Sequence, residues 1–241
     1  MKRQKSYKEK YNMRSKFVFV SKDSEFKMPR EEMDTLDRAH AMYFPNNSEP
    51  LSKIYNKVLN EDTDSDFVLL VHADVSFDPA GVIDQLEQLN GKYDLVGLCG
   101  CAKISVGQSP LNWFCGSIPY PNDRWGCVTH GELGGQVAFF SQHHPDVLDH
   151  EVACIDGLCI IFSRKAIDAG LRFDEKLSPF DFYDTDISMQ AILKYKMKVG
   201  VIIRKELQHW SVGKSILTQG FLKNEEAFRA KWGFQRRQSL N

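Results

Sequence analysis

The stretch FVLLVHADV, residues 67–75, constrains the fold of this chain more than any other segment. Five apolar residues follow one another from Phe67 to Val71, and His72 and Asp74 come directly after them. An unbroken apolar run of this length predicts a strand buried on both faces, as found inside an α/β sheet. In open α/β sheets, ligands bind beyond the carboxyl ends of the strands. We therefore expect His72 and Asp74 to lie at a binding site, where Asp74 would suit a divalent cation or would simply cap a turn.

Strands and helices alternate along the rest of the chain. The expected strands are 16–20, 67–71, 93–100, 155–162 and 198–203. The expected helices are 51–60, 79–90, 164–170 and 184–195, and Asp78 followed by Pro79 is a strong helix start. This order predicts a three-layer α/β/α sandwich around a mainly parallel central sheet. Because the chain shows no internal repeat and no low-complexity linker, we expect one domain, 1–241.

Composition and charge narrow the class of protein. Hydrophobic residues make up 42% of the chain and the net charge is −1, which is typical of a globular protein and argues against a general nucleic-acid binder. Basic residues gather in the first 15 positions, which we expect to form a flexible tail, and again near the other end. Basic ends of this kind either contact anionic lipid or are simply solvated.

The cysteines and the apolar runs predict the cellular compartment of the protein. The six cysteines form no CxxC pair, and several lie in apolar, strand-like runs. This pattern favours a reduced, cytosolic protein over a disulfide scaffold. We find neither a signal-like apolar run nor an apolar stretch of about 18 residues. We expect a cytoplasmic protein, with peripheral contact at the inner face of the membrane as the role of its basic ends.

Residues 101–150 interrupt the alternation with an irregular insertion rich in Gly, Pro, Trp and His. Two interpretations fit it equally well. The insertion is either an irregular segment with its own small β-hairpins, or one side of a binding site for an acceptor substrate, in which Trp125 stacks on a sugar ring. The histidines and carboxylates of 141–151 allow a zinc site. Because they lack a recognised ligand spacing, we favour a solvated loop.

Two acidic elements follow the insertion. Asp156 and Gly157 begin a buried strand, a pattern that indicates either close approach of a ligand to the backbone or a bulge. Asp184 and Asp186 begin an amphipathic helix. The helix dipole accounts for one of these two carboxylates as a cap. The aromatic residues just before them, including Tyr183, would hold the other in place as a general base.

A last element is LQHWSVGK, residues 207–214. His209 follows a predicted strand, and Lys214 comes five residues later. This arrangement indicates either a metal or phosphate contact or a structural histidine. Taken alone it is a weak signal.

In their order and spacing, these elements resemble glycosyltransferases of the family-2 type, which have the GT-A nucleotide-diphospho-sugar transferase fold. The resemblance covers about residues 51–215 and is most specific over 155–213. It implies that Asp74 and His209 bind the metal and that Asp184 is the catalytic base. It further implies a set of substrate-binding residues: Asn56, His72, Trp125, Asp156, Gly157, Tyr183, Asp186 and Lys214.

This chain departs from the family motif at two of these positions. His72 stands where the family has the first aspartate of its strand-end motif, and Tyr183 stands where it has the glutamate of its Glu-Asp pair. His72 is therefore expected to contact the nucleotide, the metal or neither.

The implied activity is a metal-assisted, inverting transfer of a hexosyl or deoxyhexosyl group. The donor would be a nucleoside-diphosphate sugar, the metal Mn²⁺ or Mg²⁺, and the acceptor a hydroxyl of a glycan, polysaccharide or lipid-linked glycan. Two alternatives stay open. A sugar-nucleotide nucleotidyltransferase would need a glycine-rich loop after the first strand, and this chain has none there. A catalytically degenerate module that binds a glycan or nucleotide is consistent with the altered positions His72 and Tyr183.

Overall fold

A computed structural model describes residues 14–24, 41–89, 91–104, 124–131, 147–177, 181–204, 207–211 and 218–234, together with the backbone of 137–139. The helices are α3 (Leu51–Glu61), α4 (Pro79–Leu89), α5 (Arg164–Asp168), α6 (Tyr183–Met189) with its π-helical continuation η2 (Gln190–Lys194), and α7 (Gln219–Trp232). The strands are β1 (Ser15–Val20), β2 (Ala41–Phe44), β3 (Phe67–His72), β4 (Val75–Ser76), β5 (Leu95–Gly97), β6 (Cys99–Cys101), β7 (Arg124–His130), β8 (Val137–Phe139), β9 (Asp149–Glu151), β10 (Cys154–Ile155), β11 (Cys159–Ser163), β12 (Val199–Ile202) and β13 (Gln208–His209).

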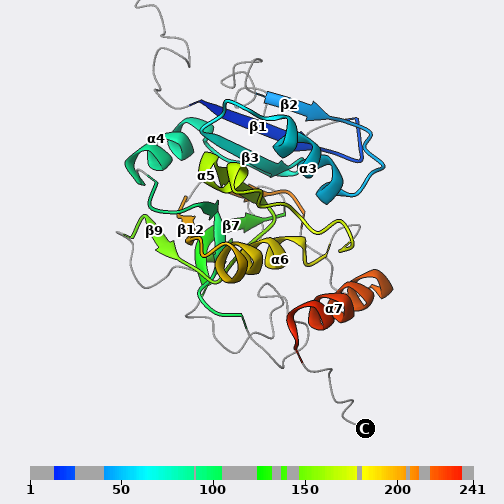
Figure 1. The fold of residues 1–241 in the computed structure, drawn as a ribbon. Coiled ribbons are helices and arrows are strands. Elements are labelled where there is room, and N and C mark those ends of the chain that lie inside the picture. The colour runs from blue at the N-terminus through cyan, green and yellow to red at the C-terminus, as the bar shows by residue number, and fades with distance from the viewer. Residues whose placement is uncertain are drawn as a thin grey trace, which may run out of the picture.

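The central layer is a seven-stranded sheet in the order β2-β1-β3-β11-β5-β12-β9 (Figure 1). Strands β1, β2, β3, β5 and β12 run in one direction, and β11 and β9 run against them. The expected mainly parallel sheet is confirmed. Strand β3 lies inside this sheet between β1 and β11, and its residues from Phe67 to Val71 are buried. The apolar run that opens the sequence argument is thus a core strand.

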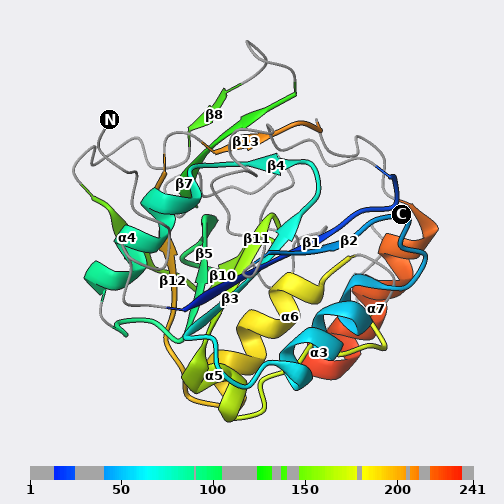
Figure 2. The same cartoon turned by 90° about the horizontal axis from the view of Figure 1, so that it is seen from above.

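Two layers cover the central sheet (Figure 2). On one face, α3, α5 and α6 pack against alternate residues of β1, β3 and β11, among them Val18, Leu70 and Ile160. On the other face, α4 packs against the residues between them, such as Phe19 and Leu69. A smaller sheet in the order β10-β6-β7-β13-β4, with β8 paired to β7, lies on the side of α4. The expected three-layer α/β architecture is therefore confirmed.

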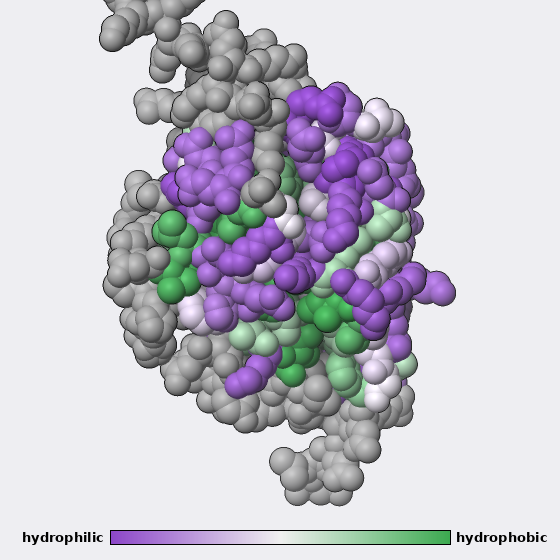
Figure 3. Space-filling model, turned by 60° about the vertical axis from the view of Figure 1, so that its left-hand side comes forward, coloured by the Kyte–Doolittle hydropathy of each residue, from purple (hydrophilic) through white to green (hydrophobic). Residues whose placement is uncertain are grey.

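The surface is hydrophilic over most of the described residues in one view, with smaller hydrophobic patches between them (Figure 3). Large hydrophobic side chains that are exposed in the described part of the chain are Leu148, Leu193 and Leu222. Single exposed leucines are ordinary in globular proteins. No helix among the described residues is both long and apolar enough to cross a membrane.

Two expected strands each divide between the two sheets. The run 93–100 forms β5 in the large sheet and β6 in the small one, and the run 155–162 forms β10 and β11. The backbones approach closely at this crossing: a Cβ on Gly100 would lie 2.3 Å from the Cys154 carbonyl oxygen. The hydrophobic pattern continues through both crossings because both sheets contribute to one core, so it does not reveal the break.

The expected helices form close to their predicted limits. Helix α4 begins at Pro79, but the Asp78 carboxylate lies 3.3 Å from Arg204, while the Asp78 carbonyl accepts a hydrogen bond from Val82 N. Helix α7 is absent from the sequence-based prediction. Its N-terminus is capped by Thr218, whose hydroxyl accepts from Phe221 N at 3.1 Å.

The insertion and the basic ends are partly described. Within the described residues of 101–150, β7 pairs with β8 as antiparallel neighbours, and β7 also pairs with β6 at the start of this segment. Residues 1–13 and 235–241 lie outside the described residues. Of the basic residues near the second end, Arg229 pairs with Glu225 in a buried ion pair and Lys231 pairs with Asp174 and Asp186. These two side chains stabilise the fold around α7.

Asn56 fixes the position of α3 on the segment that follows β11 and α5. Its side-chain oxygen accepts a hydrogen bond from Phe173 N at 2.8 Å, and its amide nitrogen donates to Phe173 O at 3.0 Å and to Glu175 Oε1 at 2.9 Å. Asn56 is buried, and its amide group satisfies backbone groups of the chain itself. Asn56 is predicted to bind substrate. In the structure its amide group instead binds Phe173 and Glu175.

We predict that Asn56→Ala lowers the free energy of unfolding by about 1–3 kcal/mol, because the Phe173 amide and carbonyl lose their buried partner. Chemical denaturation of the purified protein measures this change. The control is Ser52→Ala on the same helix: Ser52 is buried, but its hydroxyl has no hydrogen-bond partner within the described residues. Equal losses of stability in both variants would show that the Asn56 contacts contribute nothing specific.

Candidate metal centre and acidic pair

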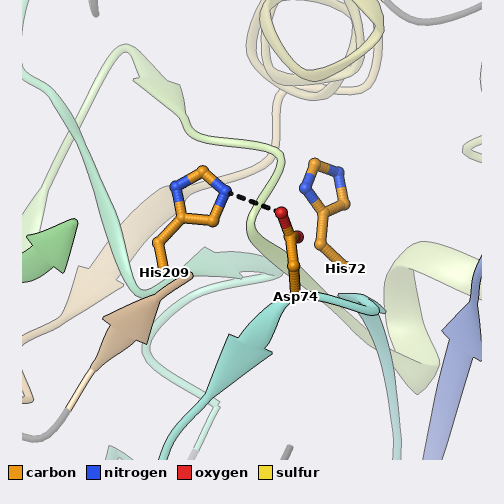
Figure 4. A group of neighbouring side chains, drawn as sticks. All are labelled: His72, Asp74 and His209. Carbon is orange, nitrogen blue, oxygen red and sulfur yellow. Dashed lines mark ion pairs between the residues drawn. The ribbon is translucent and has the colours of Figure 1, made fainter. Parts of the chain in front are cut away.

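Three side chains with metal-binding atoms meet where β3 ends. His72 is the last residue of β3, Asp74 lies in the turn before β4, and β13 pairs with β4 so that His209 stands opposite Val75. His209 Nε2 is 3.4 Å from Asp74 Oδ2 (Figure 4). Potential ligand atoms of His72, Asp74 and His209 all lie within 4.8 Å of one another, and no other such group occurs among the described residues. The structure therefore brings together Asp74 and His209, the two predicted metal ligands, and places His72 beside them.

The charges in this cluster suit a cation. Burial raises the pKa of Asp74, but the hydrogen bond from His209 and the nearby histidine charges outweigh it and lower the pKa to about 2. Burial lowers the pKa of His72 to about 4, against the opposing effect of Asp74. At neutral pH the cluster therefore offers an ionised carboxylate and, at His72, a neutral imidazole, which are the protonation states that metal binding requires.

His209 is held by two neighbours. Its Nε2 lies 2.8 Å from Ser211 Oγ, and its Nδ1 lies 3.1 Å from His130 Nδ1. The second contact arises because β13 runs parallel to β7 with His209 beside His130. His130 was missed in the sequence. The available signal was a second apolar run that ends in histidine, CVTH at 127–130, like FVLLVH at 67–72.

The turn Asp156–Leu158 connects this cluster to Asp184. Leu158 O accepts a hydrogen bond from His72 N at 3.0 Å, and Gly157 N donates to Asp184 Oδ2 at 3.1 Å. Asp184 thus lies next to the turn that contacts the last residue of β3. The strand-end motif, the Asp-Gly element and Asp184 are therefore linked by hydrogen bonds through this turn.

Asp156 and Asp184 form an acidic pair with raised pKa values. Burial and the charge of Asp184 raise the pKa of Asp156 to about 7, although Asp156 accepts a hydrogen bond from Leu158 N at 2.8 Å. Burial also raises the pKa of Asp184 to about 6, against hydrogen bonds from the Thr185 and Gly157 amides. Two neighbouring carboxyl groups with raised pKa values are candidates for proton transfer near neutral pH.

Gly157 does not provide room for a ligand in the way that the sequence suggested. A Cβ on Gly157 would lie 2.1 Å from Tyr183 Oη, so the group that approaches this backbone closely belongs to the chain itself. Tyr183 Oη donates to Gly157 O at 3.3 Å and lies 2.6 Å from His72 Nε2. Tyr183 is therefore part of the site, in contact with both His72 and the turn.

Other predicted site residues lie elsewhere. Asp186 is completely buried, where its carboxylate accepts hydrogen bonds from Gln190, Lys231 and Trp232 and so joins α6 to α7. Trp125 stacks on His150 with ring centroids 3.5 Å apart. Trp125 stands near the start of β7, whereas His130, which contacts His209, ends that strand.

Some predictions fall on residues outside the described part of the chain. Lys214 is one, and His143, His144 and Asp146 of the alternative zinc site are others. The remaining members of that group lie in β9, where Asp149 binds Lys92 and the Tyr93 hydroxyl and His150 stacks on Trp125.

The fold type follows from this architecture. The central sheet is mainly parallel and ends β3 with an acidic motif, and a smaller sheet carries His209 to that motif through its strand β13. This arrangement is the GT-A fold. The expected fold is confirmed. No family model and no curated protein matches the sequence.

Two solved structures illustrate the likeness. TarS of S. aureus aligns with a TM-score of 0.50 and 12% identity, over 91% of this chain and 39% of TarS. GalNAc-T7, in a structure with UDP, GalNAc and Mn²⁺, aligns with a TM-score of 0.50 and 11% identity, over 90% of this chain and 48% of that one. A197 from STIV is also similar, with a TM-score of 0.43 and 14% identity, over 79% of this chain and 82% of A197. The chain thus spans less than half the length of TarS and GalNAc-T7.

We predict that the acidic pair makes the metal-free protein less stable as the pH rises. Asp184 has a folded-state pKa of about 6, above the usual value of 3.8. The folded state therefore binds more protons than the unfolded state between about pH 4 and pH 7, and stability falls across this range. Asn at position 184 cannot titrate, so the stability of wild type relative to Asp184→Asn should fall from pH 4 to pH 7. Urea unfolding in EDTA measures this difference, and a difference that is constant with pH contradicts the assignment.

Proposed function

We propose that this protein is a metal-dependent glycosyltransferase that moves a sugar from a nucleoside-diphosphate sugar to a hydroxyl acceptor with inversion at the anomeric carbon. The observation that carries the proposal is the convergence of His72, Asp74 and His209 with the acidic pair on one edge of a GT-A sheet. A binding module without catalysis would have no need of a carboxylate with a raised pKa, such as Asp184, beside the candidate metal ligands.

The ligand set fits Mn²⁺ better than Mg²⁺. Mg²⁺ prefers an octahedral shell of oxygen ligands, whereas Mn²⁺ accepts imidazole nitrogen together with carboxylate oxygen. His72, Asp74 and His209 would supply two nitrogens and one carboxylate within 4.8 Å of one another. When bound, such a cation neutralises negative charge on the departing diphosphate. The GalNAc-T7 structure, which shares the fold, holds Mn²⁺ and UDP, and this supports the choice of metal and donor class.

Asp184 is the proposed general base. The Gly157 and Thr185 amides hold its two oxygens at 3.1 Å and 2.7 Å, which fixes the carboxylate without neutralising it. A pKa of about 6 leaves Asp184 mostly ionised at pH 7 and still a stronger base than an ordinary aspartate. It would accept the proton of the acceptor hydroxyl as that oxygen bonds to the anomeric carbon and the bond to the diphosphate oxygen breaks.

A single displacement of this kind requires no protein nucleophile. Cys154 and Cys159 are the thiols nearest in sequence to the Asp156 turn, and both are buried. Burial raises the pKa of each thiol well above its usual value, so neither would be a thiolate at neutral pH. These cysteines are core residues, so we assign neither of them as a nucleophile.

For the acceptor substrate and the cellular location we propose only a general class. We propose a glycan, polysaccharide or lipid-linked acceptor, a hexosyl or deoxyhexosyl donor, and a cytoplasmic protein that makes peripheral contact with a membrane through its basic N-terminal residues. Trp125 and Lys214 are retained as candidates for contact with the acceptor and the phosphates. Asn56 and Asp186 are left out because other groups of the chain occupy their polar atoms.

We predict that Asp74→Ala weakens Mn²⁺ binding by more than about 100-fold, since loss of even an outer-shell partner of a metal site costs about 10- to 100-fold. Hydrolysis of a panel of nucleotide sugars by the variant should lose its dependence on Mn²⁺. The control is Asp78→Ala, which removes a partly exposed carboxylate on the far side of β4 that pairs with Arg204. If the Asp74 variant keeps the manganese dependence of wild type, Asp74 does not bind the metal.

We predict that Asp184→Asn lowers the rate of sugar transfer by about 10²- to 10⁴-fold, because the amide cannot accept the hydroxyl proton. Donor affinity, measured by calorimetry with the intact nucleotide sugar, should stay within about twofold of wild type, since the base acts at the transition state. An equal loss of donor affinity and rate would assign Asp184 to donor binding. Saturable donor binding without turnover in wild type would favour the non-enzymatic module.

A further inference from the structure

His72 and Tyr183, the two positions at which this chain departs from the family motif, contact each other. His72 Nε2 lies 2.6 Å from Tyr183 Oη, although 111 positions separate the two residues in sequence. One stands at the end of β3 and the other at the start of α6. The contact therefore joins two elements that are distant in sequence at the candidate metal site.

The Tyr183 hydroxyl is held firmly. Its ring is buried, 5.8 Å from the Phe173 ring and 6.4 Å from the His72 ring between centroids. The backbone of Gly157 lies so close that any side chain there would collide with the hydroxyl, since a Cβ would be 2.1 Å from Oη.

The single proton of this hydroxyl has two acceptors within reach, Gly157 O at 3.3 Å and His72 Nε2 at 2.6 Å. A phenol has one proton to donate. Where Tyr183 donates to Gly157 O, it acts as an acceptor toward His72, and the His72 proton then resides on Nε2. In a neutral imidazole this places the lone pair on Nδ1, where a metal can bind. Figure 4 shows a ring nitrogen of His72 facing the Asp74 carboxylate.

We propose that Tyr183 is a positioning residue of the metal site: it donates its proton in a hydrogen bond to Gly157 O, accepts a hydrogen bond from His72 Nε2–H, and so makes Nδ1 the nitrogen that binds the cation. Gly157 contributes to this arrangement, because its carbonyl accepts the hydrogen bond from Tyr183 and its lack of a side chain leaves room for the hydroxyl. The inference rests on the metal site of the proposed function and is independent of sugar transfer. It assigns the substituted histidine to the metal, which the motif alone leaves open.

The test is Mn²⁺ binding by Tyr183→Phe, which removes the hydroxyl and keeps the ring. Titration followed by the electron paramagnetic resonance of free Mn²⁺ should show a dissociation constant about 10- to 100-fold higher than that of wild type. The control is Tyr55→Phe. Tyr55 is buried in the same core cluster, and its hydroxyl has no hydrogen-bond partner within the described residues. This control should bind Mn²⁺ within about twofold of wild type.

A double-mutant cycle with His72→Ala separates positioning from packing. If Tyr183 acts through His72, then His72→Ala combined with Tyr183→Phe should bind Mn²⁺ no more weakly than His72→Ala alone. Additive losses would overturn the inference, because Tyr183 would then act independently of His72. Unchanged Mn²⁺ affinity in Tyr183→Phe would overturn the inference and leave the metal site intact, whereas absence of Mn²⁺ binding in wild type would overturn both.

Discussion

The close contact between Gly157 and Tyr183 is the constraint on which the site depends. Three backbone groups of one turn hold the elements around it: Gly157 N donates to Asp184, Gly157 O accepts from Tyr183, and Leu158 O accepts from His72 N. The start of α6 and the end of β3 are therefore fixed to each other within hydrogen-bond length. A side chain at position 157 would separate them, because no atom can lie 2.1 Å from the Tyr183 hydroxyl.

This turn also divides the carboxylates into two kinds. Asp74 lies among histidines, and their hydrogen bond and charges lower its pKa to about 2 in spite of burial. Asp184 lies on the other side of the turn, where burial outweighs its backbone hydrogen bonds and raises its pKa to about 6. Carboxylates whose pKa values are shifted in opposite directions within one site suit different tasks. In the proposed function, Asp74 would keep its charge for a cation, and Asp184 would exchange a proton near neutral pH.

The sequence predicts the layers and the edge of the sheet at which the site lies, because these follow from local patterns. The run from Phe67 to Val71 is buried whatever its neighbours, and polar residues after it must lie at the strand end. Contacts between distant segments are a different matter. The hydrogen bonds of Asn56 depend on the path of residues 173–175. The hydrogen bond that Asp186 accepts from Trp232 depends on α7, which the sequence pattern did not reveal. His130 is recognised only through the register of β7 with β13. Hydrophobic periodicity carries no information about such pairings.

Because sequence patterns do not show contacts between distant segments, the roles of His72 and Tyr183 are ambiguous in the sequence. The fold shows that the two side chains contact each other. Each alone weakens the motif, since a carboxylate is missing at two positions. In the fold they contact each other as an imidazole and a phenol, and neither carries a negative charge. A glutamate at position 183 would place a negative charge against His72 and would favour the imidazolium, which cannot bind a metal. The tyrosine brings no such charge, so in the proposed metal site His72 would stay a usable ligand.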